Sequence, residues 1–298
     1  ELRARLRQDL NASPAAQTEA LYRQLSQPRP TAPPPPVAAA PSRRHLPVPL
    51  SERIGRDGEV AEALNLLVWR RLVTLVGTGG VGKTRLAIAV ADAALPRFDD
   101  GVWFVDLAPL TDPERVPEAT ARALGVAAQG SQPLVETLAE SLAPRSLLLV
   151  LDNCEHVSDA CARLAQELLS ACPGLRLLAT SRQALEVGGE QIFRVPSMPV
   201  PPEVPPPLEK DPHFLMEYDA VRLFVDRAVR ALDTFRLTSH NAPQVAQICR
   251  RLDGIPLAIE LAAARVRSLS VGEVQSRLDD RFALLTRGNR GALPRQQT

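Results

Sequence analysis

The stretch Leu72–Thr84, which reads LVTLVGTGGVGKT, decides how this chain folds. Its first five residues are apolar or β-branched, the composition of a buried strand. A glycine-rich turn follows them, and a helical pattern begins at Arg85. The P-loop spacing G-x-x-x-x-G-K-[ST] is filled by Gly77, Gly82, Lys83 and Thr84. A strand before this motif and a helix after it are the context in which such a loop forms.

The residue types in this turn suit the binding of phosphate. Glycines reach positive φ without strain, so successive backbone N–H groups can point into one concavity. The glycines of the turn are Gly77, Gly79, Gly80 and Gly82. The concavity and the N-terminus of the following helix attract anions, Lys83 adds a mobile charge, and Thr84 offers a hydroxyl to Mg²⁺. A chance glycine-rich turn is the alternative, and the flanking strand and helix favour nucleotide binding over it.

Apolar runs alternate with helical patterns, which predicts βαβ units and a parallel sheet. The expected strands are Leu72–Val76, Val102–Asp106, Leu147–Leu151, Leu175–Ala179 and Ile192–Val195. The expected helices of the same region are Gly58–Arg71, Arg85–Leu95, Pro113–Leu124, Pro133–Leu142 and Ser158–Ala171. Later helical patterns cover Tyr218–Leu232, Ala242–Leu252, Pro256–Ser268 and Val271–Leu285. The fold class is therefore α/β, with a three-layer parallel-sheet P-loop NTPase domain followed by a small all-α helical domain.

Composition divides the chain into six expected segments, at residues 1–27, 28–50, 51–195, 196–215, 216–285 and 286–298. The first reads as two short helices, too little to bury a core, and so as the end of a helical domain. The second and fourth are proline-rich linkers. The third is the nucleotide-binding domain, the fifth is helical, and the sixth is polar. Because the chain begins at Glu1 without a Met, we expect it to be a piece of a longer protein.

The overall composition argues against several classes of protein. A net charge of +1 and 4% aromatic residues give no sign of a broad nucleic-acid surface. The cysteines lack zinc or disulfide-framework spacing, which favours reduced thiols in a cytoplasmic protein; they are Cys154, Cys161, Cys172 and Cys249. The histidines have no metal-site spacing either. With no apolar run of membrane length and no signal peptide, we expect no membrane partner.

A second nucleotide-binding signal follows the strand at Leu147–Leu151. Asp152 ends this run and is followed by Asn153-Cys-Glu-His156. An acid at the carboxyl edge of the sheet can hold Mg²⁺ through water, together with the P-loop threonine, whereas a helix cap is the alternative role. Glu155 is the next acid, and it could polarise an attacking water or simply favour the start of a helix. Both readings of Glu155 remain open.

Arg182 closes the strand that begins at Leu175, in the string Ala179-Thr-Ser-Arg. Ligands of parallel sheets bind at the carboxyl ends of strands, so this cation is placed to meet the γ-phosphate and to sense its presence. An ordinary surface arginine is the alternative. The Asn-Lys-x-Asp string that reads guanine does not occur in the sequence, which favours adenine.

Five strings together resemble the NB-ARC branch of the STAND P-loop ATPases, in the form found in large bacterial transcriptional regulators of the SARP type. They are LVTLVGTGGVGKTRLA, GVWFVDLAPL, LLLVLDNCEH, LRLLATSRQAL and RLDGIPLAIELAAARV. The similarity covers about residues 50–298. A shorter and weaker one links Glu1–Leu25 to the C-terminal end of a bacterial transcriptional activation domain. The family's sheet order, 2-3-4-1-5, would place the Arg182 strand beside the P-loop strand.

The resemblance implies a role for each matching residue. Walker A would comprise Gly77, Thr78, Gly79, Gly80, Val81, Gly82, Lys83 and Thr84, followed by Arg85. Asp152 would be the Walker B acid and, with Thr84, would hold Mg²⁺, while Arg182 would be the first sensor; the catalytic role of Glu155 rests on the residue pattern alone. Ile54 and Arg56 would lie near adenine. Pro256, in the Gly-Ile-Pro-Leu string, would pack on the base and couple the helical domain to the nucleotide.

The sequence also departs from the family pattern. Many relatives carry two acids at the end of the Walker B strand, whereas Asn153 follows Asp152 here, so hydrolysis is less firmly implied than binding. Residues 293–298 resemble the lead-in to a winged-helix domain. That domain, with the histidine that usually contacts ADP phosphate, is expected outside this chain, as are any helix-turn-helix and sensor repeat.

We therefore expect an ATP/ADP-binding switch module of a bacterial transcriptional regulator, with Mg²⁺ as cofactor and slow ATP hydrolysis. Nucleotide state would control domain opening and self-association, and DNA would be contacted only through other domains. Three alternatives remain open: a signalling ATPase of the same family without a link to transcription, a multiple-turnover ATPase, and a direct DNA-binding module. The net charge and the lack of a helix-turn-helix oppose the last.

Overall fold

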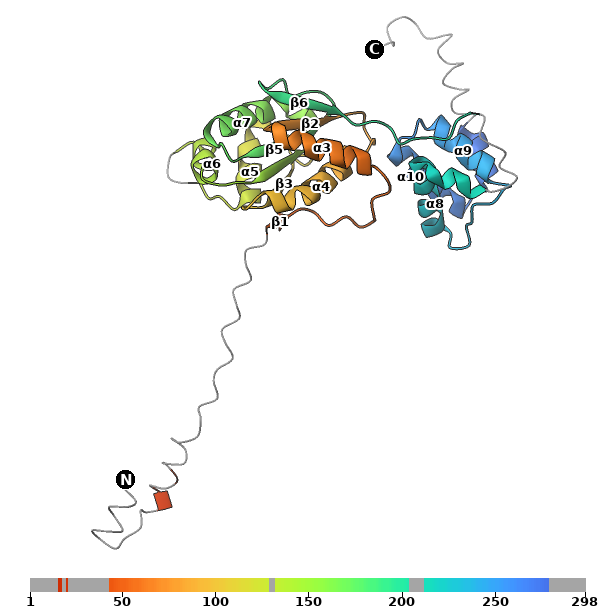
Figure 1. Cartoon of the computed structure of the whole chain (residues 1–298), viewed down its shortest axis with the longest axis horizontal. Coiled ribbons are helices and arrows are strands. Elements are labelled where there is room, and N and C mark those ends of the chain that lie inside the picture. Colours follow the sequence, from red (N-terminus) through yellow and green to blue (C-terminus); the bar gives the residue numbers. More distant parts are fainter. Residues whose placement is uncertain (1–15, 18–19, 21–42, 129–131, 204–211, 279–298) are drawn as a thin grey trace, which may run out of the picture. The chain divides into compact units, whose positions relative to one another are not determined.

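The computed structural model describes residues 16–17, 20, 43–128, 132–203 and 212–278 (Figure 1). The chain divides into two compact units, Glu1–Ser42 and Arg43–Thr298, and the sheet belongs to the second. Several sequence-based expectations lie outside the described residues. They are nearly all of the segment 1–27, most of the first linker, the polar end 286–298, and the part of the last expected helix beyond residue 278.

Six parallel strands form one sheet in the order β1-β3-β4-β5-β2-β6. Their bounds are Arg44–His45 for β1, Leu72–Val76 for β2, Val102–Asp106 for β3, Leu148–Asp152 for β4, Arg176–Ser181 for β5 and Glu190–Arg194 for β6. With the edge strand β1 set aside, this is the expected order 2-3-4-1-5. The P-loop strand β2 thus lies between β5 and β6, and the expected α/β fold class is confirmed.

Helices cover both faces of the sheet, giving three layers (Figure 1). The helices of this region are α3 (Asp57–Trp69), α4 (Lys83–Ala94), η1 (Leu95–Arg97), η2 (Pro113–Arg115), α5 (Val116–Leu124), α6 (Leu134–Leu142), η3 (Cys154–His156) and α7 (Ser158–Ala171). Side chains of β4 alternate between the faces, as the strand period of two requires. Leu149 and Leu151 pack under α5–α7, and Leu148 and Val150 pack under α3 and α4.

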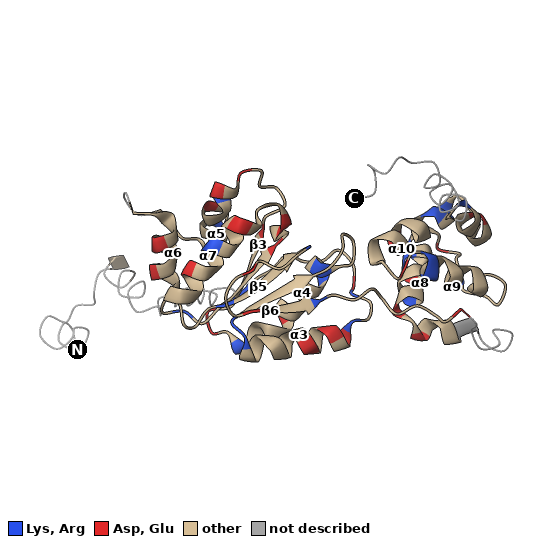
Figure 2. Ribbon diagram, turned by 90° about the horizontal axis from the view of Figure 1, so that it is seen from above, with Lys and Arg blue, Asp and Glu red and all other residues tan. Residues whose placement is uncertain are grey.

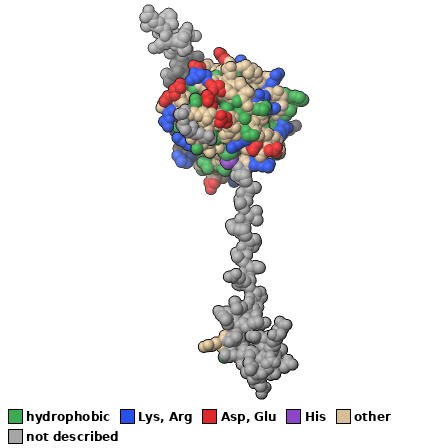
Figure 3. All heavy atoms as spheres, turned by 90° about the vertical axis from the view of Figure 1, so that its left-hand side faces the viewer, with side chains coloured by type: hydrophobic (Ala, Val, Ile, Leu, Met, Phe, Trp, Pro, Cys, Tyr) green, Lys and Arg blue, Asp and Glu red, His purple; other side chains and the backbone are tan. Residues whose placement is uncertain are grey.

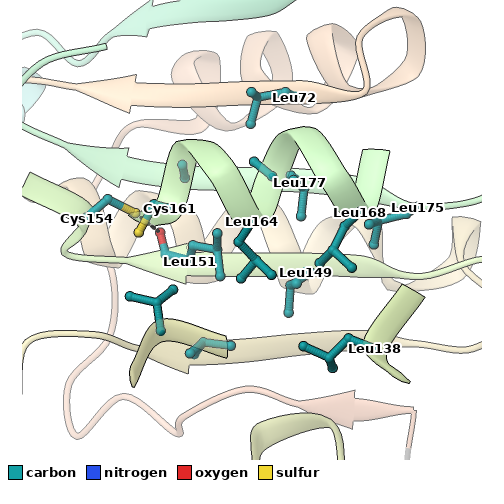
Figure 4. Packing of buried hydrophobic residues seen from close by; sticks show 14 of the residues in the cluster. Leu72, Leu138, Leu149, Leu151, Cys154, Cys161, Leu164, Leu168, Leu175 and Leu177 are labelled. Atoms are coloured by element: carbon teal, nitrogen blue, oxygen red, sulfur yellow. Dashed lines mark hydrogen bonds between the residues drawn. The ribbon is translucent and has the colours of Figure 1, made fainter. Parts of the chain in front are cut away.

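The α7 side of the core is drawn in Figure 4. Leu164 and Leu168 of α7 point onto Leu149 and Leu151 of β4. All four side chains are at most 2% exposed. Fully burying a leucine is worth roughly 1.5–3 kcal/mol, so these contacts hold β4 rigidly in place. That rigidity fixes the position of Asp152 at the end of the strand.

The C-terminal region is helical and has a hydrophobic core of its own. Its elements are η4 (Pro212–Glu217), α8 (Asp219–Ala231), α9 (Ala242–Arg251), α10 (Pro256–Ala263), η5 (Ala264–Arg267) and a helical stretch at residues 271–278. Gly254, at φ 64, turns the chain between α9 and α10. Proline at the first position of α10 fits there because that N–H has no helical partner.

Two of the expected linkers are wrong in part. Arg44 and His45 form β1 rather than an extended spacer, because Arg43 O accepts a hydrogen bond from Val102 N–H of β3 at 2.8 Å. After β6, Met198 is buried in the helical core, and its N–H donates to Gly254 O at 2.9 Å. Proline richness could not show that tertiary contacts order these parts of each segment, and the rest of the linker prediction stays a prediction.

The remaining differences concern the ends of elements. β4 and β5 end at Asp152 and Ser181, one and two residues later than the apolar runs. Pairing continues because neighbouring strands supply backbone partners, whatever the polarity of the side chain. Consequently Asp152 and Ser181 are held within the sheet rather than in a loop.

Candidate functional site: a P-loop with two lateral arginines

The P-loop joins β2 to α4 and is shaped by left-handed glycines. Gly80 and Gly82 have φ values of 77° and 94°, and Gly82 is the N-cap of α4. A Cβ on Gly77 would lie 3.0 Å from Val81, a buried residue that anchors the loop in the core. The loop therefore owes its form to glycine, as the sequence pattern predicted.

The side chain of Lys83, the first residue of α4, folds back into the P-loop. It is 8% exposed, and its Nζ donates to Gly77 O at 2.9 Å and to Thr78 O at 3.3 Å. These carbonyls hold the ammonium at the mouth of the concavity. A phosphate there would meet a charge that is already positioned and largely desolvated.

Asp152 collects hydrogen bonds from three elements. The hydroxyl of Thr84 lies 2.9 and 3.0 Å from its two carboxylate oxygens, and Thr180 Oγ1 donates to Oδ1 at 2.6 Å. Asn153 Nδ2 donates to Oδ2 at 2.9 Å. Asp152 is 1% exposed, and this burial raises the pKa of its carboxyl; the two threonine hydroxyls partly offset that effect, while Asp106 and Glu155 add to it.

Glu155 and Arg182 form an ion pair beside this cluster. Arg182 Nε donates to Glu155 Oε1 at 3.2 Å, whereas Glu155 Oε2 is buried with no partner among the described residues. The Arg182 side chain is 69% exposed, and a Cβ on Gly79 would lie 4.0 Å from its Nη2. The structure therefore brings both predicted residues to the P-loop, already paired with each other.

An open cavity of about 600 Å³ lies over the loop. It is lined by Val76, Gly77, Thr78, Gly79, Val81, Arg182, Arg194, Val195 and Ser197. Arg194, the last residue of β6, is exposed and makes no hydrogen bond or ion pair with the residues that the structure describes. No local sequence pattern marks this arginine, because its place beside the P-loop follows only from the strand order.

The predicted base-contacting residues also lie together, although Pro256 is about 200 positions after Ile54 and Arg56 in the sequence. Ile54, Arg56 and Pro256 line one narrow cavity together with Gly82 and Arg85. Its volume is about 30 Å³, too small for an adenine, which could enter only if the walls moved apart.

Arg56 is the unusual residue of that cavity. It is 5% exposed, its backbone N–H donates to Asp219 Oδ2 at 3.2 Å, and its Nη2 donates to Pro196 O at 3.0 Å. Its Nε and Nη1 atoms have no partner among the described residues. Burial lowers the pKa of the guanidinium, and Glu59 and Asp219 partly compensate. Unpaired buried donors are costly, so this side chain is well suited to a polar ligand.

The helical region contacts the P-loop directly. Leu257 N–H at the start of α10 donates to Gly80 O at 3.2 Å. Behind it, Ser51 Oγ accepts from Arg85 at 2.7 Å and from Arg227 at 3.2 Å. Glu260 of α10 pairs with Arg227 at 3.0 Å and lies 3.9 Å from Arg85. In the ribbon of Figure 2, basic residues (blue) mark α4 and acidic residues (red) mark α3.

Comparison with known proteins agrees with this geometry. Residues 69–186 match the family model described as an AAA domain. This matched segment, which is less than half of the chain, contains the P-loop, Asp152 and Arg182. A protein of Mycobacterium tuberculosis (strain H37Rv) named "Putative HTH-type transcriptional regulator Rv0890c" is 52% identical over 233 residues, which cover 78% of this chain and 24% of the relative. The chain thus spans about a quarter of that relative's length.

Two further matches are more distant. The regulatory protein AfsR of Streptomyces griseus is 30% identical over 255 residues, covering 79% of this chain and 23% of AfsR. Among solved structures, the Walker-type ATPase PABY2304 of Pyrococcus abyssi is 14% identical with a TM-score of 0.49, covering 82% of this chain and 77% of the other.

Two general properties complete the description of the site. Among the described residues no helix is both long and apolar enough to cross a membrane. Within the same ranges, no group of three or more His, Cys, Asp and Glu side chains is placed to hold a metal ion. A Mg²⁺ ion at Thr84 and Asp152 would not need such a group, since this ion is commonly held by one or two protein oxygens, phosphates and water.

Proposed function

We propose that the chain is the ATP/ADP-binding regulatory switch module of a cytoplasmic bacterial transcriptional regulator. Within it, residues 51–195 would bind the nucleotide and residues 216–285 would respond to it. The observation that carries the proposal is the hydrogen bond from Leu257 to Gly80, because it ties the helical region to the P-loop itself. A change in the loop on phosphate binding would therefore alter the position of α10 through this hydrogen bond.

The residues present suit a nucleotide with Mg²⁺. The ion would be held by Thr84 and Asp152, and it would supply positive charge that neutralises phosphate oxygens. Asp152 is buried and close to two further carboxylates that raise its pKa, so a cation would relieve an existing electrostatic cost. Lys83 would turn from the loop carbonyls to the phosphates, and Ile54, Arg56 and Pro256 would surround the base.

The narrow space at the base-side cavity suggests how a switch would work. Entry of the base requires α10 and the Ile54–Arg56 turn to separate, and the terminal phosphate would act on Arg182 and the loop. Moving such an equilibrium from 1:99 to 99:1 needs about 5.5 kcal/mol of differential binding. Opening would expose surface for self-association, and DNA contact would come from other parts of the full-length protein.

A multiple-turnover ATPase is the second candidate, and the geometry favours it less. Asn153 stands where a second acid would be, and the carboxylate of Glu155 is already paired with Arg182. We therefore expect hydrolysis slower than about 1 s⁻¹, at the low end of typical enzyme turnover. On the face drawn in Figure 3, acidic, basic and apolar side chains are interspersed, which gives the DNA-binding alternative no support there.

Substitution Lys83→Ala tests the proposal. It removes the buried ammonium at the mouth of the loop. Affinity for both ATP and ADP should therefore fall by at least about tenfold, which corresponds to the loss of one charge-assisted hydrogen bond. Fluorescent-nucleotide titration with Mg²⁺ measures this. Arg70→Ala is the control, since it removes an exposed cation just before β2, at the opposite edge of the sheet. Equal affinities of wild type and Lys83→Ala would overturn the proposal.

A further inference from the structure

We propose that Arg194 and Arg182 together form a two-arginine clamp for the terminal phosphate of a bound nucleoside triphosphate. This inference rests on the proposed function, and it adds a phosphate-binding residue, Arg194, on the side of the P-loop opposite to Arg182. Three observations support it: the strand register, the charge of the residues that line the cavity, and the partners of the two guanidinium groups.

The sheet brings both arginines to the same level. Val76, the last residue before the P-loop, is paired with Ser181 of β5 on one side and with Arg194 of β6 on the other. Arg182 follows Ser181 directly. Because β2 lies between β5 and β6, the two arginines flank the base of the loop at its two sides.

Both side chains reach one cavity. Arg182 and Arg194 line the hollow of about 600 Å³ whose floor is formed by Gly77, Thr78 and Gly79. None of the residues that line it is acidic. A cavity wall that carries two cations and no acid favours the binding of an anion.

The two cations differ in what holds them. Arg182 is paired with Glu155, while Arg194 makes no hydrogen bond or ion pair with the described part of the chain. Arg194 is therefore free to bind a ligand without breaking a contact. Its planar fork matches two oxygens of one phosphate group.

The clamp predicts discrimination between triphosphate and diphosphate. The terminal phosphate adds charge and the oxygens that Arg194 would bind, whereas the β-phosphate is already surrounded by the loop and Lys83. Arg182 would leave Glu155 when the terminal phosphate arrives, and Arg194 would approach from β6. β6 leads directly through Val195 and Pro196 into the segment that packs on the helical core, so phosphate binding would pull on that connection.

Isothermal titration of the 298-residue chain with Mg²⁺ and either ADP or a non-hydrolysable ATP analogue tests the clamp. For Arg194→Gln we expect affinity for the ATP analogue to fall about 10- to 100-fold, the fold-change of one charge-assisted hydrogen bond, with ADP affinity within twofold of wild type. Arg182→Gln should act in the same direction. Arg194→Lys, which keeps the charge but loses the fork, should fall between wild type and Arg194→Gln.

Arg70→Gln is the matched control, because it removes the same charge from an exposed site at the other end of the sheet. Adding inorganic phosphate to the ADP-bound protein distinguishes a site for the terminal phosphate of a nucleotide from a site for free phosphate. The clamp would be overturned if Arg194 were needed to bind free phosphate but gave no preference for the ATP analogue over ADP. Equal losses for ATP and ADP in Arg194→Gln, or no change beyond that of Arg70→Gln, would overturn it too. A wild-type chain that binds neither nucleotide would overturn the proposed function itself.

Discussion

Asn153 both adopts a left-handed backbone conformation and donates a hydrogen bond to Asp152. Its φ of 62° is left-handed, a conformation that asparagine tolerates better than most residues. Its amide donates to Asp152, and its backbone N–H donates to Thr180 Oγ1 at 2.9 Å. An aspartate here would place a second negative charge beside the buried carboxylate. The departure from a two-acid pattern therefore stabilises Asp152 while removing a candidate for activating water.

Cys249 provides a pH-dependent test. Burial in the helical core raises the pKa of its thiol to about 12, from an ordinary value of 9.0. The unfolded thiol ionises first, so the stability that this group provides is complete below pH 9 and is lost as pH rises towards 12. Between pH 9 and 11 we expect the free energy of unfolding to fall by roughly 1.4 kcal/mol per unit from this residue.

Urea denaturation across this pH range, on wild type and Cys249→Ala, measures that contribution. The variant starts less stable because it loses buried atoms, but its stability should decline less steeply above pH 9. Identical slopes for the two proteins would show that the thiol ionises as readily in the fold as in the unfolded chain.

At the edge of the sheet, β1 can pair with β3 only because Gly101, the residue just before β3, has no side chain. A Cβ on Gly101 would lie 2.2 Å from Arg43 O, the carbonyl that accepts from Val102. Next along β1, His45 stacks on Trp103 with ring centroids 3.5 Å apart, and Arg44 pairs with Asp92 of α4 at 2.7 Å. Two residues of strand are short, but these side-chain contacts attach the segment to both β3 and α4.

Gly101→Ala should therefore displace β1, and Gly125→Ala is its control. Both glycines have positive φ, so each substitution costs about 1–2 kcal/mol of backbone strain, but a Cβ on Gly125 has nothing within 4 Å. We expect only Gly101→Ala to change the fluorescence of Trp103 and to speed hydrogen exchange at the Val102 amide. Matching spectra and exchange rates in the two variants would show that β1 does not need this close approach.

Within the unit Arg43–Thr298, the helical and sheet regions have separate main cores, and they are joined by polar contacts at a few points and by Ile54, which packs against the helical core. The polar contacts include Leu257 with Gly80, Arg56 with Asp219, Ser51 with Arg227, and Arg85 with Glu260. Hydrogen bonds of this kind contribute about 1 kcal/mol each. Such an attachment can be released by a ligand's binding energy, which a continuous hydrophobic core would resist.

Gly55→Ala tests this attachment, with Gly58→Ala as control. A Cβ on Gly55, at φ 66, would lie 1.7–2.4 Å from the carboxylate atoms of Asp219. It should therefore push α8 away and increase hydrogen exchange of the Arg56 and Leu257 amides. Gly58 lies in α3 with nothing within 4 Å, so alanine there should raise stability by up to about 1 kcal/mol. Unchanged exchange in Gly55→Ala would mean that the turn does not hold the helical region.

The sequence by itself determined the parts of this protein that depend on local pattern. The apolar run and the glycines of Leu72–Thr84 predicted strand, loop and helix, because period and backbone freedom act over a few residues. The acid at 152 and the arginine at 182 were found in the same way, each at the end of an apolar run. Their roles in binding and sensing stay predictions.

Only the tertiary structure decided which distant residues meet. Strand order placed Arg194 beside the P-loop, pairing brought Thr180 to Asp152, and docking of the helical region set Asp219 against Arg56. Arg194, Thr180 and Asp219 stand in no sequence pattern that would have marked them for these roles. Each acquires its partner from packing between elements far apart in the chain, where register and buried area, rather than neighbouring sequence, fix the contact.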